Sequence, residues 1–192
     1  MIGITGSIGA GKSLVGRLLR DRHIRVIDAD VAVHHLYRDN VGLRAAIAKE
    51  FGDDILTEKG ICRSRMANLI FGDPSARTRL ESLVYPVLTE YLLRENPAFV
   101  EAALFENVPE LVEHLDEIWV VTASEEVRLK RLVEKRDFTE EDARRRIELQ
   151  RPRDSETSWL QRFPGKTVRF IDNSQDESSL EKQIETLTDA NP

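Results

Sequence analysis

An eight-residue phosphate-binding pattern, G-x-x-x-x-G-K-[ST], constrains this chain more than any other feature of its sequence. It runs from Gly6 to Ser13. Closely spaced glycines allow backbone N–H groups to approach phosphate oxygens, where a Cβ atom would block the approach. We expect Lys12 to meet the β- and γ-phosphates and Ser13 to offer its hydroxyl to Mg²⁺. The pattern therefore predicts a site for a nucleoside triphosphate.

The residues on either side of this pattern have the periodicity that such a loop requires. A short apolar run at 2–5 predicts a strand before it, and apolar residues at helical spacing predict a helix after it. That helix would direct the positive end of its dipole at the phosphates. The alternative is a glycine-rich turn with an incidental lysine. The predicted nucleotide-binding residues of the loop are Gly6, Ser7, Ile8, Gly9, Ala10, Gly11, Lys12, Ser13 and Leu14.

Composition limits the class of protein. A chain of 192 residues with 41% hydrophobic and 32% charged residues is typical of one globular domain. A net charge of −6 argues against binding to nucleic acid or to an anionic membrane, since both attract positive surface charge. The single cysteine, Cys62, suits a reducing compartment, so we expect a cytoplasmic location. With a strand predicted to start at residue 2, we expect no signal peptide.

Two carboxylates follow a second predicted strand at 24–27. Asp28 and Asp30 lie two residues apart, so in an extended segment they would project to the same side. In parallel α/β sheets the ligand crevice lies at the carboxyl ends of the strands, and we therefore expect both to face the phosphates. The alternative is that Asp30 caps a helix predicted from Val31 to Tyr37.

The next part of the chain is predicted to be helical, with helices at 43–51 and 62–71. A third helix begins at the Asp73-Pro74 pair, where a capping carboxylate precedes a proline whose missing N–H costs nothing at the first helical position. Pro86 falls inside the apolar pattern of this helix and removes a backbone hydrogen bond. We therefore expect either a kink near Tyr85 or two helices that meet there.

Three further apolar runs, at 99–105, 118–122 and 168–171, predict the remaining strands. The first two are nearly continuous rather than alternating, which is typical of parallel strands covered on both faces. A crossover helix at 109–115 can connect them, and another helix closes the chain. The fold class predicted from these elements is α/β with a parallel sheet.

Residues 128–153 are basic in an otherwise acidic chain, with ten Arg or Lys against six Asp or Glu. Thr139 followed by Asp142 resembles a capping box, so we predict a helix at 140–150. One interpretation is a solvated surface with an Asp142–Arg146 ion pair. The other is a lid whose arginines close over the transferring phosphates. The residues alone leave both interpretations open.

Taken together, these residues resemble the dephospho-CoA kinases, P-loop enzymes that use ATP to phosphorylate the ribose 3′-hydroxyl of dephospho-CoA at the last step of coenzyme A synthesis. The resemblance runs almost from end to end, and its combination of motifs is specific where each motif alone is not. The matching residues are T-G-S-I-G-A-G-K-S at 5–13, V-I-D-A-D at 26–30, Phe51-Gly52, Gly60 with Arg63 ahead of Ile70-Phe71, L-F-E at 104–106, Arg131, Arg136, R-I-x-x-Q at 146–150 and I-D-N at 171–173.

The resemblance implies a site and its chemistry. Asp30 would be the general base, Arg136 and Arg146 would be lid arginines, and all three would join Lys12 in catalysis with ATP and Mg²⁺. Asn173 would belong to the adenine-side pocket. The residues expected to bind the acceptor, a small molecule, are Asp28, Asp30, Arg63, Tyr85, Leu104 and Glu106.

The resemblance also implies the P-loop NTPase fold, with a five-stranded parallel sheet flanked by helices and the topology of the nucleoside monophosphate kinases. One domain would span residues 1–192. Its parts would be a core of 1–30, 98–135 and 167–192, a helical acceptor-binding insertion at about 31–97, and a lid at about 136–165.

The chain departs from the family pattern mainly on the acceptor side. Tyr85-Pro86 stands where His-Pro is usual, Ala102-Ala103 stands where Pro-Leu is usual, and the alanine–aspartate pair often found before the last strand is not evident at 163–167. Two alternatives therefore stay open. One is a P-loop kinase for another small acceptor, such as a nucleoside monophosphate, and the other is a non-catalytic ATP-binding module. The sequence predicts no oligomeric state.

Overall fold

The structure is a computed structural model that describes residues 1–189, so the last three residues of the predicted domain, 190–192, lie outside the described residues. The chain forms two compact units. The first consists of residues 1–26 and 97–192, and the second of residues 27–96. The second unit begins a few residues before the segment that the sequence marks as an insertion.

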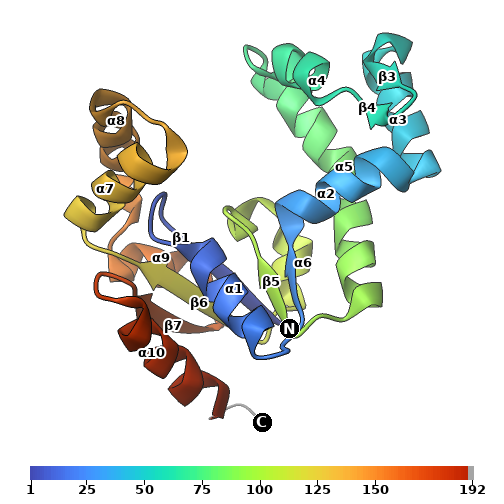
Figure 1. The fold of residues 1–192 in the computed structure, drawn as a ribbon. Helices are drawn as coiled ribbons and strands as arrows, with labels where there is room; N and C mark the ends of the chain where they lie inside the picture. Colours follow the sequence, from blue (N-terminus) through green and yellow to red (C-terminus); the bar gives the residue numbers. More distant parts are fainter. Residues whose placement is uncertain (190–192) are drawn as a thin grey trace. The chain divides into compact units, whose positions relative to one another are not determined.

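A five-stranded sheet with the strand order β2-β5-β1-β6-β7 carries the first unit (Figure 1). Strand β1 (Ile2–Gly6) pairs in parallel with β5 (Phe99–Glu101) and with β6 (Glu117–Thr122). Strand β6 pairs in parallel with β7 (Thr167–Asp172). Strand β2 (Val26–Asp28) lies at one edge, where the chain passes from the first unit to the second. The predicted fold class, with its parallel sheet, is confirmed.

Strand β5 is shorter than the predicted strand at 99–105. It ends at Glu101, and the chain continues into a short 3₁₀ helix, η2 (Phe105–Asn107). Phe105 is fully buried because it packs beside Gly3 of the central strand. Burial in a turn and burial in a strand give the same apolar run, so periodicity alone does not separate them. The prediction of a strand as far as residue 105 is wrong.

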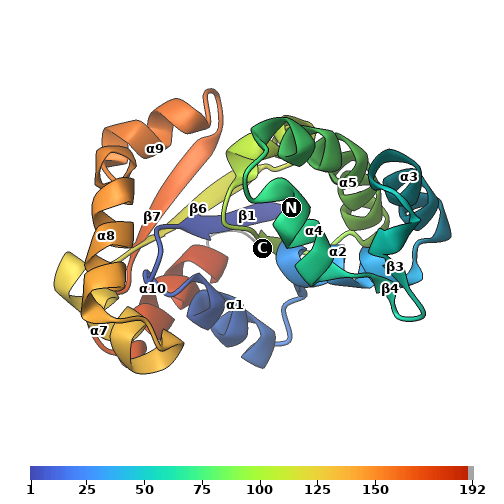
Figure 2. The ribbon, with the colours of Figure 1, turned by 90° about the horizontal axis from the view of Figure 1, so that it is seen from above.

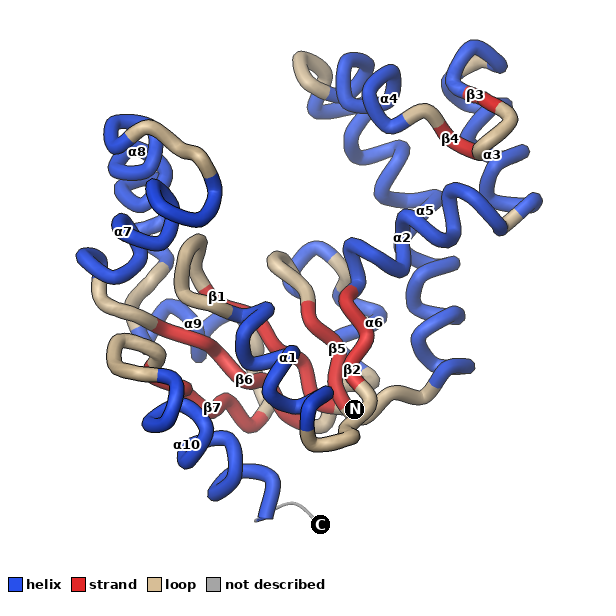
Figure 3. Tube along the Cα trace, viewed as in Figure 1, coloured by secondary structure: helices blue, strands red, loops and turns tan. Residues whose placement is uncertain are grey.

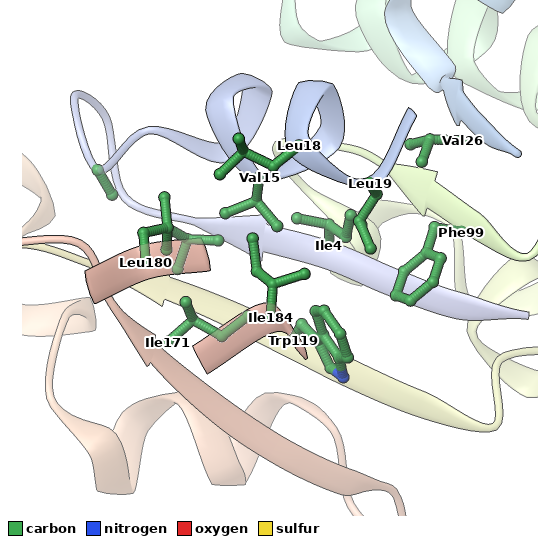
Figure 4. Packing of buried hydrophobic residues seen from close by; sticks show 12 residues of the cluster. Ile4, Val15, Leu18, Leu19, Val26, Phe99, Trp119, Ile171, Leu180 and Ile184 are labelled. Atoms are coloured by element: carbon green, nitrogen blue, oxygen red, sulfur yellow. The ribbon is translucent and has the colours of Figure 1, made fainter. Parts of the chain in front are cut away.

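The main core lies between the sheet and two helices, α1 (Lys12–Asp21) and α10 (Glu177–Asp189). Side chains from both helices converge on Ile4 and Trp119 of the sheet (Figure 4). The rings of Phe99 and Trp119 meet edge to face, with centroids 4.8 Å apart. This packing fixes β1 and α1 against each other, and so fixes both ends of the loop that joins them. The buried cluster consists of Ile4, Ala10, Val15, Leu18, Leu19, Val26, Phe99, Trp119, Val121, Ile171, Leu180 and Ile184.

The first unit has further helices between β5 and β7. They are α6 (Pro109–Glu113), α7 (Glu125–Arg136), α8 (Glu140–Gln150), η3 (Arg151–Arg153) and α9 (Glu156–Arg162). Helices α7 and α8 lie side by side, as the view from above shows (Figure 2). They pack through a small apolar cluster of Leu132, Ala143 and Ile147. Ser124 caps α7, and Thr139 caps α8, which confirms the predicted start of α8.

The second unit is mainly helical, with one two-stranded hairpin (Figure 3). The first half of this unit ends in the hairpin of β3 and β4, and the second half is an αα pair. The elements are α2 (Ala29–Asp39), α3 (Val41–Phe51), η1 (Asp53–Ile55), β3 (Leu56–Thr57), β4 (Gly60–Ile61), α4 (Arg63–Ile70) and α5 (Pro74–Glu95).

Helix α5 runs without interruption through Pro86. The prediction that two helices meet there is therefore wrong. Pro86 is exposed, so water can satisfy the carbonyl group that loses its helical partner. The predicted start of the helix is confirmed, since Asp73 accepts the N–H groups of Ser75 and Ala76. At the other end, the C-cap Asn96 adopts the left-handed conformation with φ 43°. Within residues 1–189, no helix combines the length and the apolar character needed to cross a membrane.

Candidate active site

The loop between β1 and α1 has a backbone conformation suited to phosphate binding. Gly9 and Gly11 have φ values of 77° and 100°, in the left-handed region that glycine tolerates. A Cβ atom at Gly9 would lie 2.9 Å from the backbone oxygen of Arg128, so the loop packs too closely there for any larger residue. Helix α1 begins at Lys12, directly after the loop, and its first N–H groups therefore point into it.

Lys12 folds back over this loop. Its Nζ donates to the carbonyl oxygen of Gly6 at 2.8 Å and lies 3.5 Å from the carbonyl oxygen of Ser7. The ammonium group is thus held at the mouth of the loop by backbone oxygens. A phosphate bound to the loop would meet this charge without a large movement of the side chain.

Ser13, the predicted magnesium ligand, donates its hydroxyl to Oε1 of Glu101 at 2.7 Å. Glu101 ends β5, the strand beside β1, and is only 5% exposed. A hydroxyl and a carboxylate are oxygen ligands of the kind that Mg²⁺ takes alongside substrate phosphates. The Ser13–Glu101 pair therefore fits an ion that the phosphates of a nucleotide would also hold. Among residues 1–189, no three or more His, Cys, Asp or Glu side chains form a metal-binding group.

A first pocket adjoins the loop on the side of Gly9 and Gly11. Asn173, predicted for the adenine side, lines it but is only 1% exposed, and its Nδ2 donates to the carbonyl oxygen of Ala10 at 2.8 Å. Arg131 donates to that same oxygen at 3.1 Å and to the carbonyl oxygen of Asn173 at 2.9 Å. Both side chains therefore hold the loop backbone at Ala10. The pocket is lined by Gly9, Gly11, Leu14, Arg131, Leu132, Lys135, Arg136 and Asn173.

A second pocket adjoins the loop on the side of Gly6 and Ser7. Leu104, predicted to bind the acceptor, lines it. Glu106, which follows in η2, accepts a hydrogen bond from Arg153 at 2.7 Å and lies 3.7 Å from Arg162. Sequence reasoning singled out neither arginine. The pocket is lined by Gly6, Ser7, Ala103, Leu104, Gln150, Arg153, Asp154, Trp159 and Arg162.

Asp28 and Asp30 lie in the second unit, at the start of α2. Asp28 is the helix cap, and its Oδ1 accepts the N–H groups of Asp30 at 2.8 Å and of Val31 at 3.1 Å. Capping by Asp30, the structural alternative for that residue, is therefore wrong. The strand also ends at Asp28, so the two carboxylates do not share one side of an extended segment. Asp30 is exposed in the first turn, near the positive end of the helix dipole.

Two other predicted acceptor residues also belong to the second unit. Arg63 is the first residue of α4 and is exposed, whereas Tyr85 is half-buried in α5. The charge of Arg63 acts on Tyr37. Burial raises the pKa of the Tyr37 hydroxyl to about 12, and the nearby guanidinium of Arg63 opposes that rise. Tyr37 therefore remains a neutral hydrogen-bonding group near a fixed positive charge.

The two predicted lid arginines have different surroundings. Arg136 is the last residue of α7 and lines the first pocket, next to the phosphate loop. Arg146, on α8, stacks over the ring of Phe138 at 4.7 Å from its centroid. The predicted surface pair with Asp142 is not what holds Arg146, because Asp142 instead accepts the hydroxyl of Thr139 at 3.0 Å.

Several residues that shape the loop were missed from the sequence. Glu101 was visible only as an acidic residue inside an apolar run, and Gln150 only as the last residue of the R-I-x-x-Q motif. Arg128 and Asp154 carried no local signal of their own. Each contacts the loop from 88 or more positions away in the chain. Contacts of this kind follow from the fold and not from any short pattern.

Known proteins resemble this chain in sequence and in fold. A family model described as dephospho-CoA kinase matches residues 1–162. A protein from Listeria innocua named dephospho-CoA kinase is 34% identical over 195 residues, which cover 97% of this chain and 94% of that protein. A solved structure from Thermus thermophilus has a TM-score of 0.74 at 24% identity and covers 100% of this chain and 97% of its own. A dephospho-CoA kinase structure from Campylobacter jejuni has a TM-score of 0.67 at 21% identity, with 98% and 94% covered.

Proposed function

The chain belongs to the dephospho-CoA kinase family, and from that premise we propose that it transfers the γ-phosphate of ATP to the ribose 3′-hydroxyl of dephospho-CoA, giving coenzyme A and ADP. One observation in the structure supports this activity above all. The phosphate loop has one pocket beside Gly9 and Gly11 and another beside Gly6 and Ser7. A phosphotransferase needs places for a donor and for an acceptor on either side of the group that moves.

The donor side supports ATP as the phosphate source. The N–H groups at the start of α1 and the ammonium of Lys12 would hold the phosphates, and the pocket lined by Arg131, Lys135 and Arg136 would take the rest of the nucleotide. Mg²⁺ would be held by Ser13 and Glu101 together with the phosphates, where it neutralises charge on the β- and γ-oxygens. The protein's part is to place these groups before transfer begins.

The acceptor side is argued from the chemistry of single residues. Asp30 is our candidate general base, and its exposed carboxylate is not consumed by helix capping, which Asp28 performs. Dephospho-CoA carries a diphosphate, and Arg153 and Arg162 place positive charge in the pocket beside Gly6 and Ser7. Leu104 lines the same pocket, and Glu106 pairs with both arginines. Arg63 and Tyr85 are further candidates for acceptor binding. The cytoplasmic location stays a prediction.

The acceptor is tested by comparing kcat/KM for dephospho-CoA, AMP, CMP and adenosine with one enzyme preparation, ATP and Mg²⁺. We expect dephospho-CoA to give the highest value, with the new phosphate located on the 3′-oxygen by phosphorus NMR. A nucleoside monophosphate that exceeds dephospho-CoA would show a kinase for another acceptor, in keeping with the changes at Tyr85, Ala102 and Ala103. Tight ATP binding with no transfer to any acceptor would show a non-catalytic module instead.

Arg136→Ala and Arg146→Ala are each expected to lower kcat by about 100-fold, because a lost guanidinium removes a donor aimed at charge that develops during transfer. Each variant should also weaken the protection that bound nucleotide gives residues 136–165 in hydrogen exchange. Arg144→Ala is the matched control, since Arg144 lies on the same helix but pairs with Glu140 on the surface at 2.6 Å. Exchange of 136–165 that is identical with and without nucleotide would show that this segment is not a lid.

A further inference from the structure

The tip of the phosphate loop, Ser7 and Ile8, is held by three side chains that lie outside the loop. The hydroxyl of Ser7 donates to Oδ1 of Asp154 at 2.5 Å. The backbone N–H of Ile8 donates to Oε1 of Gln150 at 2.8 Å, and the carbonyl oxygen of Ile8 accepts from Nε of Arg128 at 2.8 Å. One hydroxyl, one N–H and one carbonyl of the tip are thus each engaged by a different side chain.

The three side chains also contact one another. Nη1 of Arg128 donates to Oδ2 of Asp154 at 2.6 Å, and Nη2 lies 3.5 Å from Oε1 of Gln150. Arg128 is only 5% exposed, so its charge depends on this carboxylate for compensation. The backbone of Arg128 is equally close to the loop, because a Cβ atom on Gly9 would meet it. The tip therefore rests directly on the first turn of α7.

An apolar contact links the same elements. The side chain of Ile8 packs against the cluster of Leu132, Ala143 and Ile147, through which α7 and α8 meet. Gln150 is the last residue of α8, and Asp154 follows the short helix η3. The loop tip thus has polar and apolar contacts to the segment that carries the predicted lid arginines.

We propose that Arg128, Gln150 and Asp154 are positioning residues for phosphoryl transfer, which hold the tip of the phosphate loop in a fixed relation to helix α8. Gln150 and Asp154 also line the pocket beside Gly6 and Ser7, but this role needs no contact with phosphate or acceptor. They act through the backbone of Ile8 and the hydroxyl of Ser7, and so set where the phosphate-binding N–H groups point. This inference rests on the proposed kinase activity, since it concerns how the transferring phosphate is placed.

A purely structural role would predict a different outcome from a positioning role. If the cluster only stabilises the fold, its loss lowers the thermal midpoint and leaves the turnover of the folded enzyme unchanged. If it positions the loop, a small displacement of the phosphate costs turnover, and misplacement of about 1 Å can cost about 100-fold. The two roles are therefore separated by kcat and by the local exchange of the loop.

The test compares Gln150→Met and Asp154→Asn with wild type. Methionine keeps the shape of glutamine without the acceptor for the Ile8 N–H, and asparagine keeps the shape of aspartate without its charge. Arg151→Gln is the matched control, since Arg151 joins the same two segments by pairing with Glu125 at 3.0 Å but lies on the surface, away from the loop. We expect kcat to fall by about tenfold to 100-fold in the first two variants, by more than any change in KM for dephospho-CoA, whose proposed pocket Gln150 and Asp154 also line. Hydrogen exchange of residues 6–11 should accelerate in both, and the control should match wild type.

The inference is overturned if both variants keep wild-type kcat, whether or not their thermal midpoints fall. Should Asp154→Asn fail to fold because it uncovers the buried charge of Arg128, Gln150→Met alone decides, since it removes no charge. Absence of dephospho-CoA turnover in wild type would refute the proposed function. In that case hydrogen exchange at residues 6–11 of Gln150→Met decides whether these side chains hold the loop. An exchange rate equal to that of wild type would overturn the inference.

Discussion

Lys12→Ala is expected to abolish phosphoryl transfer while the protein stays folded. The ammonium of Lys12 is held over the loop by the carbonyl oxygens of Gly6 and Ser7, where it would face the charge that builds on the transferring phosphate. Removing one such preorganised donor costs about 100- to 1000-fold in kcat. Lys12 is not part of the buried apolar cluster beneath α1, so little stability should be lost.

The measurement for Lys12→Ala is the transfer of labelled γ-phosphate to dephospho-CoA, with a thermal melt on the same preparation. Lys49→Ala is the matched control, because Lys49 is an exposed lysine on α3 in the second unit. Turnover that survives in Lys12→Ala at the wild-type rate would remove the assignment of the loop as the phosphate site. A large fall of the thermal midpoint would instead show that this lysine supports the fold.

Asp30→Asn is expected to lower the transfer rate by about 100- to 10,000-fold, the range for loss of a general base. The affinity for ATP should change far less, because a base that accepts the acceptor's proton acts mainly in the transition state. In the structure Asp28, and not Asp30, caps α2, so the substitution should leave the start of the helix intact.

The test for Asp30→Asn combines single-turnover transfer with ATP binding measured by calorimetry. Asp53→Asn is a suitable control, since Asp53 is also an exposed aspartate at the start of a short helix in the second unit. If Asp30→Asn loses thermal stability but keeps its transfer rate, Asp30 supports the helix and another group takes the proton. If ATP affinity falls as far as the rate, the residue belongs to nucleotide binding instead.

Short sequence patterns predicted those parts of the fold that adjacent residues determine. The strand and the helix on either side of the phosphate loop and the caps at Asp73 and Thr139 are each set by a few adjacent residues, and each of these predictions is confirmed. The strand predicted for the apolar run at 99–105 was too long, because a buried turn and a buried strand need the same apolar side chains.

Less of the candidate site could be predicted from the sequence, because the side chains that bond to the loop residues come from distant parts of the chain. The partner of Ser13 is Glu101, on the neighbouring strand, and the partners of Ser7 and Ile8 come from α7, from the end of α8 and from beyond it. The cap role of Asp28 was not predicted, because it depends on where the strand stops, and single-residue boundaries are the least certain part of a sequence-based prediction.

The two pockets that flank the phosphate loop have a consequence for inhibitor design. With the proposed assignment of the pockets, a compound directed at the Asn173 side would compete with the nucleotide, and one directed at the Arg153 side would compete with the acceptor. A molecule that joins both halves through a phosphate chain across Gly6 to Gly11 would bind its second half at a high effective concentration.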